Sequence, residues 1–336
     1  MDRAAYGTPV REWIGIDARR FEQEVLSLRQ PAVFRGLASA WPAVRATDIG
    51  AYLRRFDNGT PCALLEAAPS TRGRFFYNSD ITGFNFGRSP ASVTGALDRL
   101  AAEAGVADPP ALALQAVVAD VALPGFSAAN ATPIVPEGVG PRLWLGNRVH
   151  VATHYDLSSN LAIVVAGRRH FTLFPPEQVA NLYVGPLEFT PAGTPISMVD
   201  AAAPDLDRFP LFATAMAAAQ TAELAPGDAI YIPYLWWHHV ESLDPLSILA
   251  NYWWSETRQP QPGLAPIDVL RHARLAFSAL SPEQRAAWRP LIDHFVFDDA
   301  RSMDHLPVER RGILGSIGDA SRRTLRRHLG LLLGND

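Results

Sequence analysis

Short apolar segments of strand length, separated by turn residues, fill the middle of the chain. The turn signals include Gly167-Arg168, Pro175-Pro176, Ala225-Pro226-Gly227-Asp228 and Asp244-Pro245. Many short strands at such spacing are typical of an antiparallel barrel or jelly roll, so we expect a mainly β protein with added helices. The strand-length segments are Leu143–Gly146, Leu161–Val165, His170–Phe174, Ala229–Ile232 and Leu246–Trp254.

The remainder of the chain is expected to be largely helical or irregular. Pro31–Leu37 is predicted to be a further strand, and Pro175–Asp207 is a long Pro-dotted insertion of the kind that often shapes a binding site. The helix candidates are Val10–Leu28, Ala46–Asp57, Ser92–Gly105, Pro266–Leu280, Pro282–Val296 and Val308–Leu333. Strand signals cease after about Arg258, which predicts a barrel with N-terminal α/β elements over 1–258 and a helical unit over 259–336.

A His-x-Asp motif and a later histidine suggest a metal site. Residues i and i+2 of a strand point to the same face, so His154 and Asp156 can reach one metal ion. His238, in the segment Trp236–Val240, would be the third ligand. Two imidazoles and one carboxylate are the ligand set of non-haem iron(II) sites with open positions. We therefore predict that His154, Asp156 and His238 are the metal ligands and catalytic residues.

The parity of a strand selects between the adjacent histidines. His238 and His239 must face opposite sides, and His239 shares its side with Glu241. A charged glutamate is not expected to face an apolar interior unpaired, so His238 is predicted to point inward. The other histidines lack such context and are expected to be structural or surface residues: His150, His170, His272, His294, His305 and His328.

Between His154 and Trp254, many short sequence motifs occur in the same order as in the JmjC and cupin-like 2-oxoglutarate oxygenases, and the chain resembles that family. The resemblance is strongest to the branch that contains the asparaginyl hydroxylase called factor inhibiting HIF, and it covers about a hundred residues with a fainter extension upstream. The motifs are His154-Tyr155-Asp156, Asn160, Phe174-Pro175-Pro176, Asp205-Leu206-Asp207-Arg208-Phe209-Pro210, Pro226-Gly227-Asp228, Tyr231-Ile232-Pro233, Trp236-Trp237-His238-His239-Val240-Glu241-Ser242 and Asn251-Tyr252-Trp253.

The resemblance implies a double-stranded β-helix, an Fe(II) ion and 2-oxoglutarate as co-substrate. It places Arg169 where the family commonly anchors the distal carboxylate with a lysine, and this chain contains no lysine. A guanidinium can grip a carboxylate in a bidentate fork. Asn160 and Asn251 are suited to form hydrogen bonds with the chelating end of 2-oxoglutarate or with the metal ligands. The alternative is that both are ordinary buried amides. Trp253 would wall the pocket.

Two positions depart from the family pattern. The tyrosine and threonine that support the distal carboxylate in the asparaginyl hydroxylase are matched here by Ala113 and Val151, which carry no hydroxyl. Tyr77 or Thr153 is a candidate replacement. The alternative is weaker binding of the co-substrate.

The composition of the chain limits which binding partners are expected. The formal net charge is −4, so no overall positive field is available to hold nucleic acid. No apolar run approaches the length of a membrane span and no signal peptide is apparent, so a cytoplasmic protein is expected. The single Cys62 excludes an internal disulfide. Helical tails in similar enzymes form homodimer interfaces, and the same is expected here.

The sequence thus predicts an Fe(II)- and 2-oxoglutarate-dependent hydroxylase that oxidises an unactivated C–H bond and releases succinate and CO₂. The substrate could be a protein side chain or a small molecule, and the motifs do not separate these classes. A non-catalytic cupin-fold metal-binding or sensing module is the alternative. The Asn251 and Arg169 positions favour catalysis, because a passive metal site would not need them.

Overall fold

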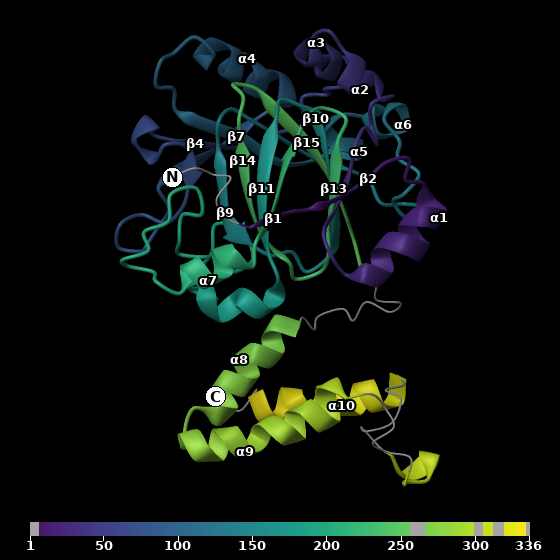
Figure 1. Ribbon diagram of the computed structural model, residues 1–336, viewed down its shortest axis with the longest axis vertical. Helices are drawn as coiled ribbons and strands as arrows, with labels where there is room; N and C mark the ends of the chain where they lie inside the picture. The colour runs from purple at the N-terminus through teal and green to yellow at the C-terminus, as the bar shows by residue number, and fades with distance from the viewer. Residues whose placement is uncertain (1–6, 256–265, 299–304, 312–318, 334–336) are drawn as a thin grey trace. The chain divides into compact units, whose positions relative to one another are not determined.

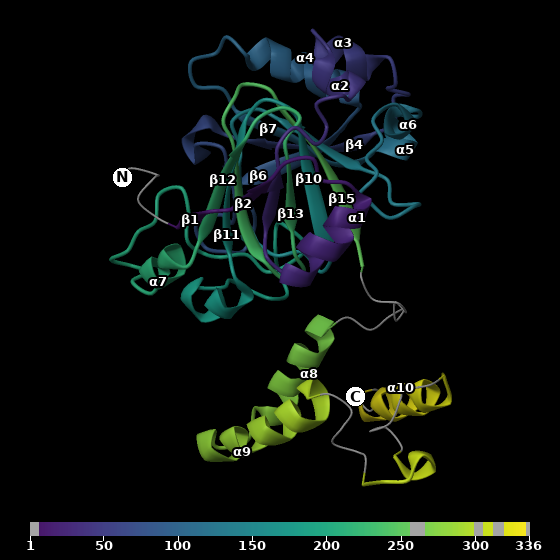
Figure 2. The ribbon, with the colours of Figure 1, turned by 45° about the vertical axis from the view of Figure 1, so that its right-hand side comes forward.

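The computed structural model describes residues 7–255, 266–298, 305–311 and 319–333 (Figures 1 and 2). The chain divides into two compact units, Met1–Arg258 and Gln259–Asp336. Among the described residues, no helix is both long and apolar enough to cross a membrane.

The first unit is built on two facing β-sheets. The smaller sheet has the strand order β1-β12-β11-β14-β9-β5, and the larger has the order β2-β3-β13-β10-β15-β8-β7-β4-β6. The smaller sheet consists of β1 (Thr8–Pro9), β5 (Arg74–Phe75), β9 (His150–His154), β11 (Arg169–Phe174), β12 (Gln220–Leu224) and β14 (Trp237–Ser242). The larger consists of β2 (Arg11–Trp13), β3 (Ala32–Phe34), β4 (Cys62–Ala67), β6 (Phe86–Ala91), β7 (Ala111–Val118), β8 (Arg142–Gly146), β10 (Ser159–Ala166), β13 (Ala229–Ile232) and β15 (Ser247–Trp254).

This arrangement confirms the predicted jelly roll with added helices. The five strands expected from the apolar segments all form, and β10 lies between β13 and β15 in antiparallel register. Alternate side chains of these strands fill the space between the sheets. That inner cluster includes Ala162, Val164, Phe171, Leu173, Ile230, Val240 and Leu249.

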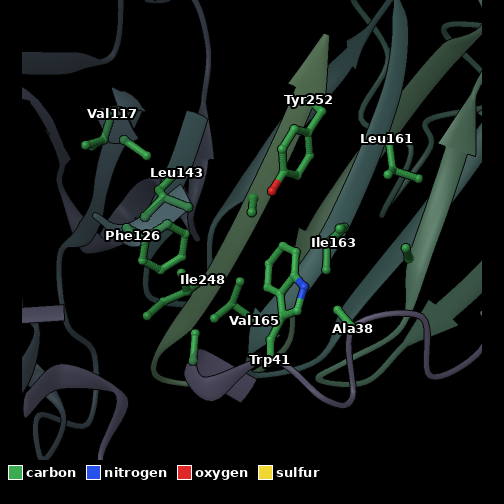
Figure 3. Packing of buried hydrophobic residues seen from close by; sticks show 14 of the residues in the cluster. Ala38, Trp41, Val117, Phe126, Leu143, Leu161, Ile163, Val165, Ile248 and Tyr252 are labelled. Atoms are coloured by element: carbon green, nitrogen blue, oxygen red, sulfur yellow. The ribbon is translucent and has the colours of Figure 1, made fainter. Parts of the chain in front are cut away.

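Helices cover the outer face of the larger sheet. Side chains on this face, such as Ile163 and Ile248, pack against Trp41 and Phe126 from the N-terminal region (Figure 3). In both ribbon views α2, α3 and α4 lie together at one end of the sheets. The N-terminal helices are α1 (Ala18–Arg20), α2 (Pro42–Arg45), α3 (Ile49–Arg54), α4 (Val93–Glu103), α5 (Ala119–Ala122) and α6 (Phe126–Ala129).

The insertion after β11 packs against one end of the smaller sheet. It contains the 3₁₀-helix Pro176–Asn181 and α7 (Phe212–Ala217). Leu182, Val199 and Phe212 from this segment bury Phe174 and Trp237 of the sheet. As a result, all residues of β14 are buried, on both of its faces.

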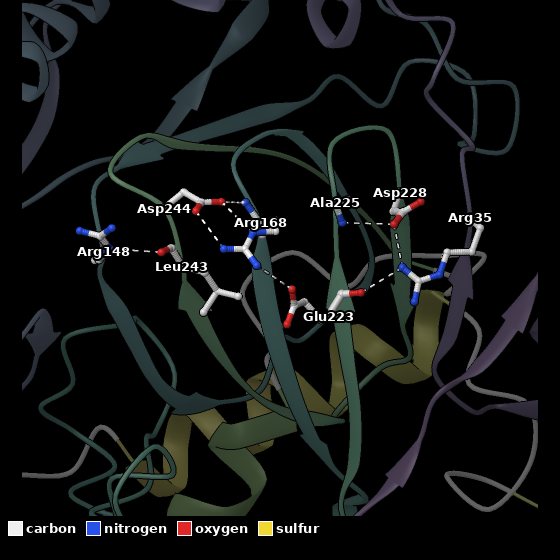
Figure 4. A network of polar contacts seen from close by, with 8 residues as sticks. All are labelled: Arg35, Arg148, Arg168, Glu223, Ala225, Asp228, Leu243 and Asp244. Carbon is white, nitrogen blue, oxygen red and sulfur yellow. Dashed lines mark hydrogen bonds and ion pairs between the residues drawn. The ribbon is translucent and has the colours of Figure 1, made fainter. Parts of the chain in front are cut away.

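Charged side chains fix the turns that link the strands (Figure 4). Arg35 donates to Asp228 Oδ2 at 2.7 Å, and this carboxylate also accepts a hydrogen bond from the backbone N–H of Ala225, which closes the predicted turn. Arg168 lies between Asp244 and Glu223, with ion-pair distances of 3.2 Å to each. Gly167, just before it, has a φ of 67° that favours glycine.

Two of the helix predictions were wrong in extent. Val10–Leu28 begins with strand β2, which adds to β3 in parallel, and only Ala18–Leu28 is helical, in α, π and 3₁₀ turns. Val308–Leu333 is not one helix, because Arg311 lies outside both the 3₁₀ turn Val308–Arg310 and α10 (Asp319–Leu333). Pairing with a neighbouring strand overrides the weak helical periodicity of the first segment.

The second unit is helical in the part that the structure describes. It contains α8 (Pro266–Phe277), α9 (Pro282–Ile292), the π-helical turn Asp293–Phe297 and α10. Ser281 begins α9 with a capping box completed by Gln284. None of the residues in α8, α9 or the π turn is buried.

Candidate active site

His154, Asp156 and His238 come together at one end of the sandwich. His154 ends β9 and pairs in register with His238 of β14, so their rings lie 4.3 Å apart between centroids. Asp156 follows β9 and places Oδ2 3.7 Å from His238 Nε2. One ligand atom from each residue lies within 4.8 Å of the others. The residues of the predicted triad are therefore close enough to share one metal ion.

Backbone carbonyl groups orient both imidazoles. His154 Nδ1 lies 2.9 Å from the carbonyl oxygen of Ala152, and His238 Nδ1 lies 3.0 Å from that of Trp236. Carbonyl oxygens only accept, so each Nδ1 carries the proton and each Nε2 keeps a lone pair for a metal. Burial, and then the neighbouring His154, lower the pKa of His238 to about 4. His238 is therefore a neutral donor at neutral pH.

A chain of amide and indole groups holds the carboxylate. Trp253 Nε1 donates to Asp156 Oδ2 at 3.0 Å, and Asn160 Nδ2 donates to the same oxygen at 2.9 Å. Asn251 Nδ2 in turn donates to Asn160 Oδ1 at 2.8 Å. The three donors lie on the adjacent strands β10 and β15. Asn160 thus bonds the carboxylate directly, and Asn251 does so through Asn160. The hydrogen bond from Trp253 was not predicted from the sequence.

An open cavity adjoins the triad on the side of Asp156. Its volume is about 520 Å³, and Asp156, Trp253, Arg142 and Leu157 contribute to its wall, together with the loop Gly138–Gly140. This loop lies within the Pro/Gly-rich segment before β8. A small molecule or an extended side chain can therefore approach Asp156 from solvent.

Arg169 is a buried cation inside the sandwich. It starts from β11 in the smaller sheet and crosses to the larger sheet, where Nε donates to Ser247 Oγ at 2.8 Å and Nη2 donates to the Trp144 carbonyl at 3.4 Å. Only 4% of Arg169 is exposed, and burial lowers its pKa to about 9, so it remains charged at neutral pH. No carboxylate among the described residues forms an ion pair with it.

Neither Tyr77 nor Thr153, the candidate hydroxyl partners of the distal carboxylate, contacts Arg169. Tyr77 donates to the carbonyl oxygen of Phe189 at 2.6 Å, and Thr153 Oγ1 is buried without a hydrogen-bond partner among the described residues. The hydroxyl at the guanidinium belongs to Ser247, at the first residue of β15. The approach of β11 to β15 across the interior is a tertiary contact that no local sequence pattern reveals.

Glu241 and the histidines near it form a polar cluster on the other face of β14. Glu241 points away from His238, as the alternation of side chains along β14 requires. The face of β14 that carries Glu241 is also buried, and Glu241 itself is only 3% exposed. Its carboxylate lies near His150, His170 and His239, at 3.9, 3.5 and 3.8 Å respectively. His150 and His170 are therefore parts of a polar cluster that sequence reasoning assigned to no site.

Comparisons with known proteins agree with this fold and cluster. The family model of the cupin-like domain matches residues 18–259. The first unit is therefore a cupin-like jelly roll. Because the match covers more than half of the chain, the chain belongs to the cupin-like family that includes JmjC proteins.

Curated relatives match parts of the chain. JmjC domain-containing protein 5 of Drosophila melanogaster is 28% identical over 239 residues, covering 70% of this chain and 57% of that protein. Human HSPB1-associated protein 1 is 38% identical over 113 residues, which is 33% of this chain and 22% of that protein. The mouse tRNA wybutosine-synthesizing protein 5 is 34% identical over 102 residues, covering 30% and 29%. The chain thus spans less than two thirds of each of these relatives.

Proposed function

We propose that this protein is an Fe(II)- and 2-oxoglutarate-dependent oxygenase that hydroxylates an unactivated C–H bond. The observation that carries the proposal is the convergence of His154, Asp156 and His238 beside an open cavity. In the reaction, dioxygen supplies one oxygen atom to the substrate and one to 2-oxoglutarate, which leaves as succinate and CO₂.

The residues fit a ferrous ion. Two neutral imidazoles and one carboxylate are the donors that non-haem iron(II) oxygenases use, and they leave coordination positions open. The carbonyl groups of Ala152 and Trp236 fix the imidazole tautomers, and Trp253 and Asn160 fix the carboxylate. When bound, the metal would supply the redox chemistry, while these side chains hold its ligands in place.

Arg169 supports 2-oxoglutarate as the co-substrate. A buried guanidinium without a carboxylate partner is costly, and a dicarboxylate whose far end lies against it would offset that cost. Arg169 and Leu173, the register partner of His238, are separated along β11 by about 13 Å. The arginine side chain reaching into the interior and a five-carbon diacid together can bridge such a span.

The substrate is either a protein side chain or a small molecule. The relatives have names that indicate different substrates, since one is a tRNA wybutosine-synthesizing protein and another, from Arabidopsis thaliana, is a lysine-specific demethylase. The cavity at Asp156 opens to solvent and carries Arg142 at its wall, so it would admit a projecting group with an acceptor or negative charge. Screening peptides and small metabolites for a gain of one oxygen atom by mass spectrometry would separate the two classes.

The test of catalysis is release of CO₂ from 2-oxoglutarate by the iron-loaded protein. We expect wild-type protein and an Asp207→Ala control, altered at an exposed carboxylate, to release CO₂, and Asp156→Ala to release none. The alternative, a metal-binding module without turnover, predicts stabilisation by metal with no binding of 2-oxoglutarate. Such a result would overturn the proposal.

We also propose that the second unit joins two copies of the chain. Its described helices carry many exposed large apolar side chains and bury none, which is unusual for a surface in water. The exposed apolar residues are Val269, Leu270, Leu275, Trp288, Leu291, Phe295, Val296 and Phe297. Pairing with the same surface of a second copy would cover them.

A further inference from the structure

A second cluster of metal-binding side chains lies behind the first, across the smaller sheet. His238 and His239 are consecutive residues of β14, so their side chains leave opposite faces of that sheet. On the face of His239, one ligand atom each from His150, His239 and Glu241 lies within 4.8 Å of the others. The triad of the proposed oxygenase uses none of these residues.

The register of three neighbouring strands assembles this cluster. Glu241 of β14 is paired with His150 of β9 on one side and with His170 of β11 on the other. A bulge between His238 and Val240 shifts the register of β9, which brings His150 to the face of Glu241. The cluster is therefore held by backbone pairing and does not depend on flexible loops.

Among the described residues, the two ring nitrogen atoms of His239 have no hydrogen-bond partner. Both Nδ1 and Nε2 are buried, and His239 as a whole is only 2% exposed. Such orphaned polar atoms are rare in folded proteins, and a bound ion is one of the partners that account for them.

The spacing of the cluster is too wide for hydrogen bonds and close to that of a metal site. His239 Nε2 lies 3.8 Å from Glu241 Oε1, and His150 Nε2 lies 3.9 Å from Oε2 of the same residue. Ligands that bind zinc tetrahedrally at about 2.0–2.2 Å are separated from one another by roughly 3.4 Å. Each of these two pairs would need to close by only about half an ångström, and the three ligand atoms all lie within 4.8 Å of one another.

Solvent can reach the cluster through His150. This residue is partly exposed and lines a cavity of about 310 Å³ with Gly73, Arg148 and Pro245. His170 Nδ1, 3.5 Å from Glu241 Oε1, approaches the same carboxylate from the opposite strand and can orient it. A cation thus has both an entry route and an oriented ligand set.

We propose that His150, His239 and Glu241 form a second site for a divalent transition-metal ion, with zinc as the fitting ion. Two imidazoles and one glutamate are a recurrent zinc ligand set. The site is independent of the proposed oxygenase activity. A metal there would tie β9 to β14 behind the triad, so its role is to stabilise the sheet that carries His154 and His238.

The test is a metal titration on a background that lacks the first site. A His154→Ala/Asp156→Ala variant of the full chain, freed of metal by chelation, is titrated with Zn²⁺ and its metal content is measured by mass spectrometry. We expect one equivalent at micromolar affinity or tighter and a rise in Tm. The same variant with His150→Ala added should bind at least tenfold more weakly, whereas His272→Ala, at an exposed histidine of α8, should change nothing.

Two results would overturn the proposal. One is a His154→Ala/Asp156→Ala variant that folds and takes up no zinc. The other is undiminished uptake when His150→Ala is added, or when Glu241→Gln is added in a protein that remains folded by circular dichroism. Cobalt(II) gives a second readout, because its visible absorption bands report nitrogen and oxygen ligation directly, and the bands should disappear with His150→Ala.

Discussion

The indole Nε1 of Trp253 donates a 3.0 Å hydrogen bond to Oδ2 of Asp156. Trp253 thus does more than wall the cavity, because it fixes the carboxylate of the predicted metal-binding triad. The adjacent Trp254 points to the other face of β15 and packs in the helix-covered core.

This hydrogen bond leads to a prediction on metal affinity. Trp253→Phe keeps an aromatic ring but removes the donor, and we expect the Fe(II) affinity to fall about tenfold. Trp254→Phe is the matched control, since it should lower stability without changing metal affinity. Calorimetric titration of both variants with Fe(II) or Mn²⁺ measures the effect. Equal affinities in the wild type and Trp253→Phe would contradict the assignment.

The amide chain behind Asp156 predicts a graded series. Asn160 bonds the carboxylate directly, whereas Asn251 acts through Asn160. We therefore expect Asn160→Ala to weaken metal binding more than Asn251→Ala does. The two dissociation constants, measured in parallel by metal titration, test this order, and a reversed order would mean that Asn251 has another role at the site.

Arg169 predicts opposite effects on co-substrate binding and on stability. Arg169→Met removes a buried charge that has no carboxylate partner among the described residues, so the ligand-free protein should be no less stable than the wild type. The affinity for 2-oxoglutarate should fall by at least tenfold. Ser247→Ala, which removes the hydrogen bond to Nε, should cost about tenfold in the same affinity. Thermal melts with and without 2-oxoglutarate measure both quantities, and a destabilised Arg169→Met protein with normal 2-oxoglutarate binding would refute the role of an anchor.

Gly167 predicts a local effect on stability. A Cβ at this position would press on the carbonyl oxygen of Leu246, and the φ of 67° is unfavourable for alanine. We expect Gly167→Ala to lower the free energy of unfolding by about 2 kcal/mol. Gly105, where an added Cβ would meet nothing within 4 Å, is the control and should tolerate alanine. Urea unfolding of both variants gives the comparison.

The second unit predicts a change of mass in solution. If its apolar face joins two copies, Leu291→Glu/Phe295→Glu should convert a dimer to a monomer, because the charges would be buried in the interface. Arg285→Glu, at an exposed position of α9, should leave the dimer intact. Light scattering at micromolar concentration measures the mass. A monomeric wild-type protein would end the proposal.

The sequence predicts much of this site, and the parts it misses have physical reasons. The sequence motifs point to His154, Asp156 and His238, and these three residues do come together. Asp156, however, follows β9 and does not lie on the strand with His154, so strand alternation alone does not explain its position. The contact of Ser247 with Arg169 depends on which strands face each other across the interior, and the contact of His150 with Glu241 depends on which strands pair. Inter-strand register is a tertiary property. The parity argument selected His238 correctly, but it did not indicate that the face of β14 with Glu241 is buried as well.

The fold shows the same division. Strands β8, β10, β11, β13 and β15 follow from apolar runs and turns, whereas β4, β6, β7 and β12 were not predicted. In β4 and β6 the exposed residues weaken the apolar pattern. Strand β2 was mistaken for the start of a helix, because its three residues gain their structure from β3.

The most direct test of the central claim is to titrate 2-oxoglutarate into the Fe(II)-loaded protein without dioxygen, while following visible charge-transfer absorption. We expect an absorption band that saturates at one equivalent in the wild type, needs more 2-oxoglutarate in Arg169→Met, and is absent in Asp156→Ala. Iron that binds with no such band at any concentration of 2-oxoglutarate would show that the triad does not form a 2-oxoglutarate-binding iron site.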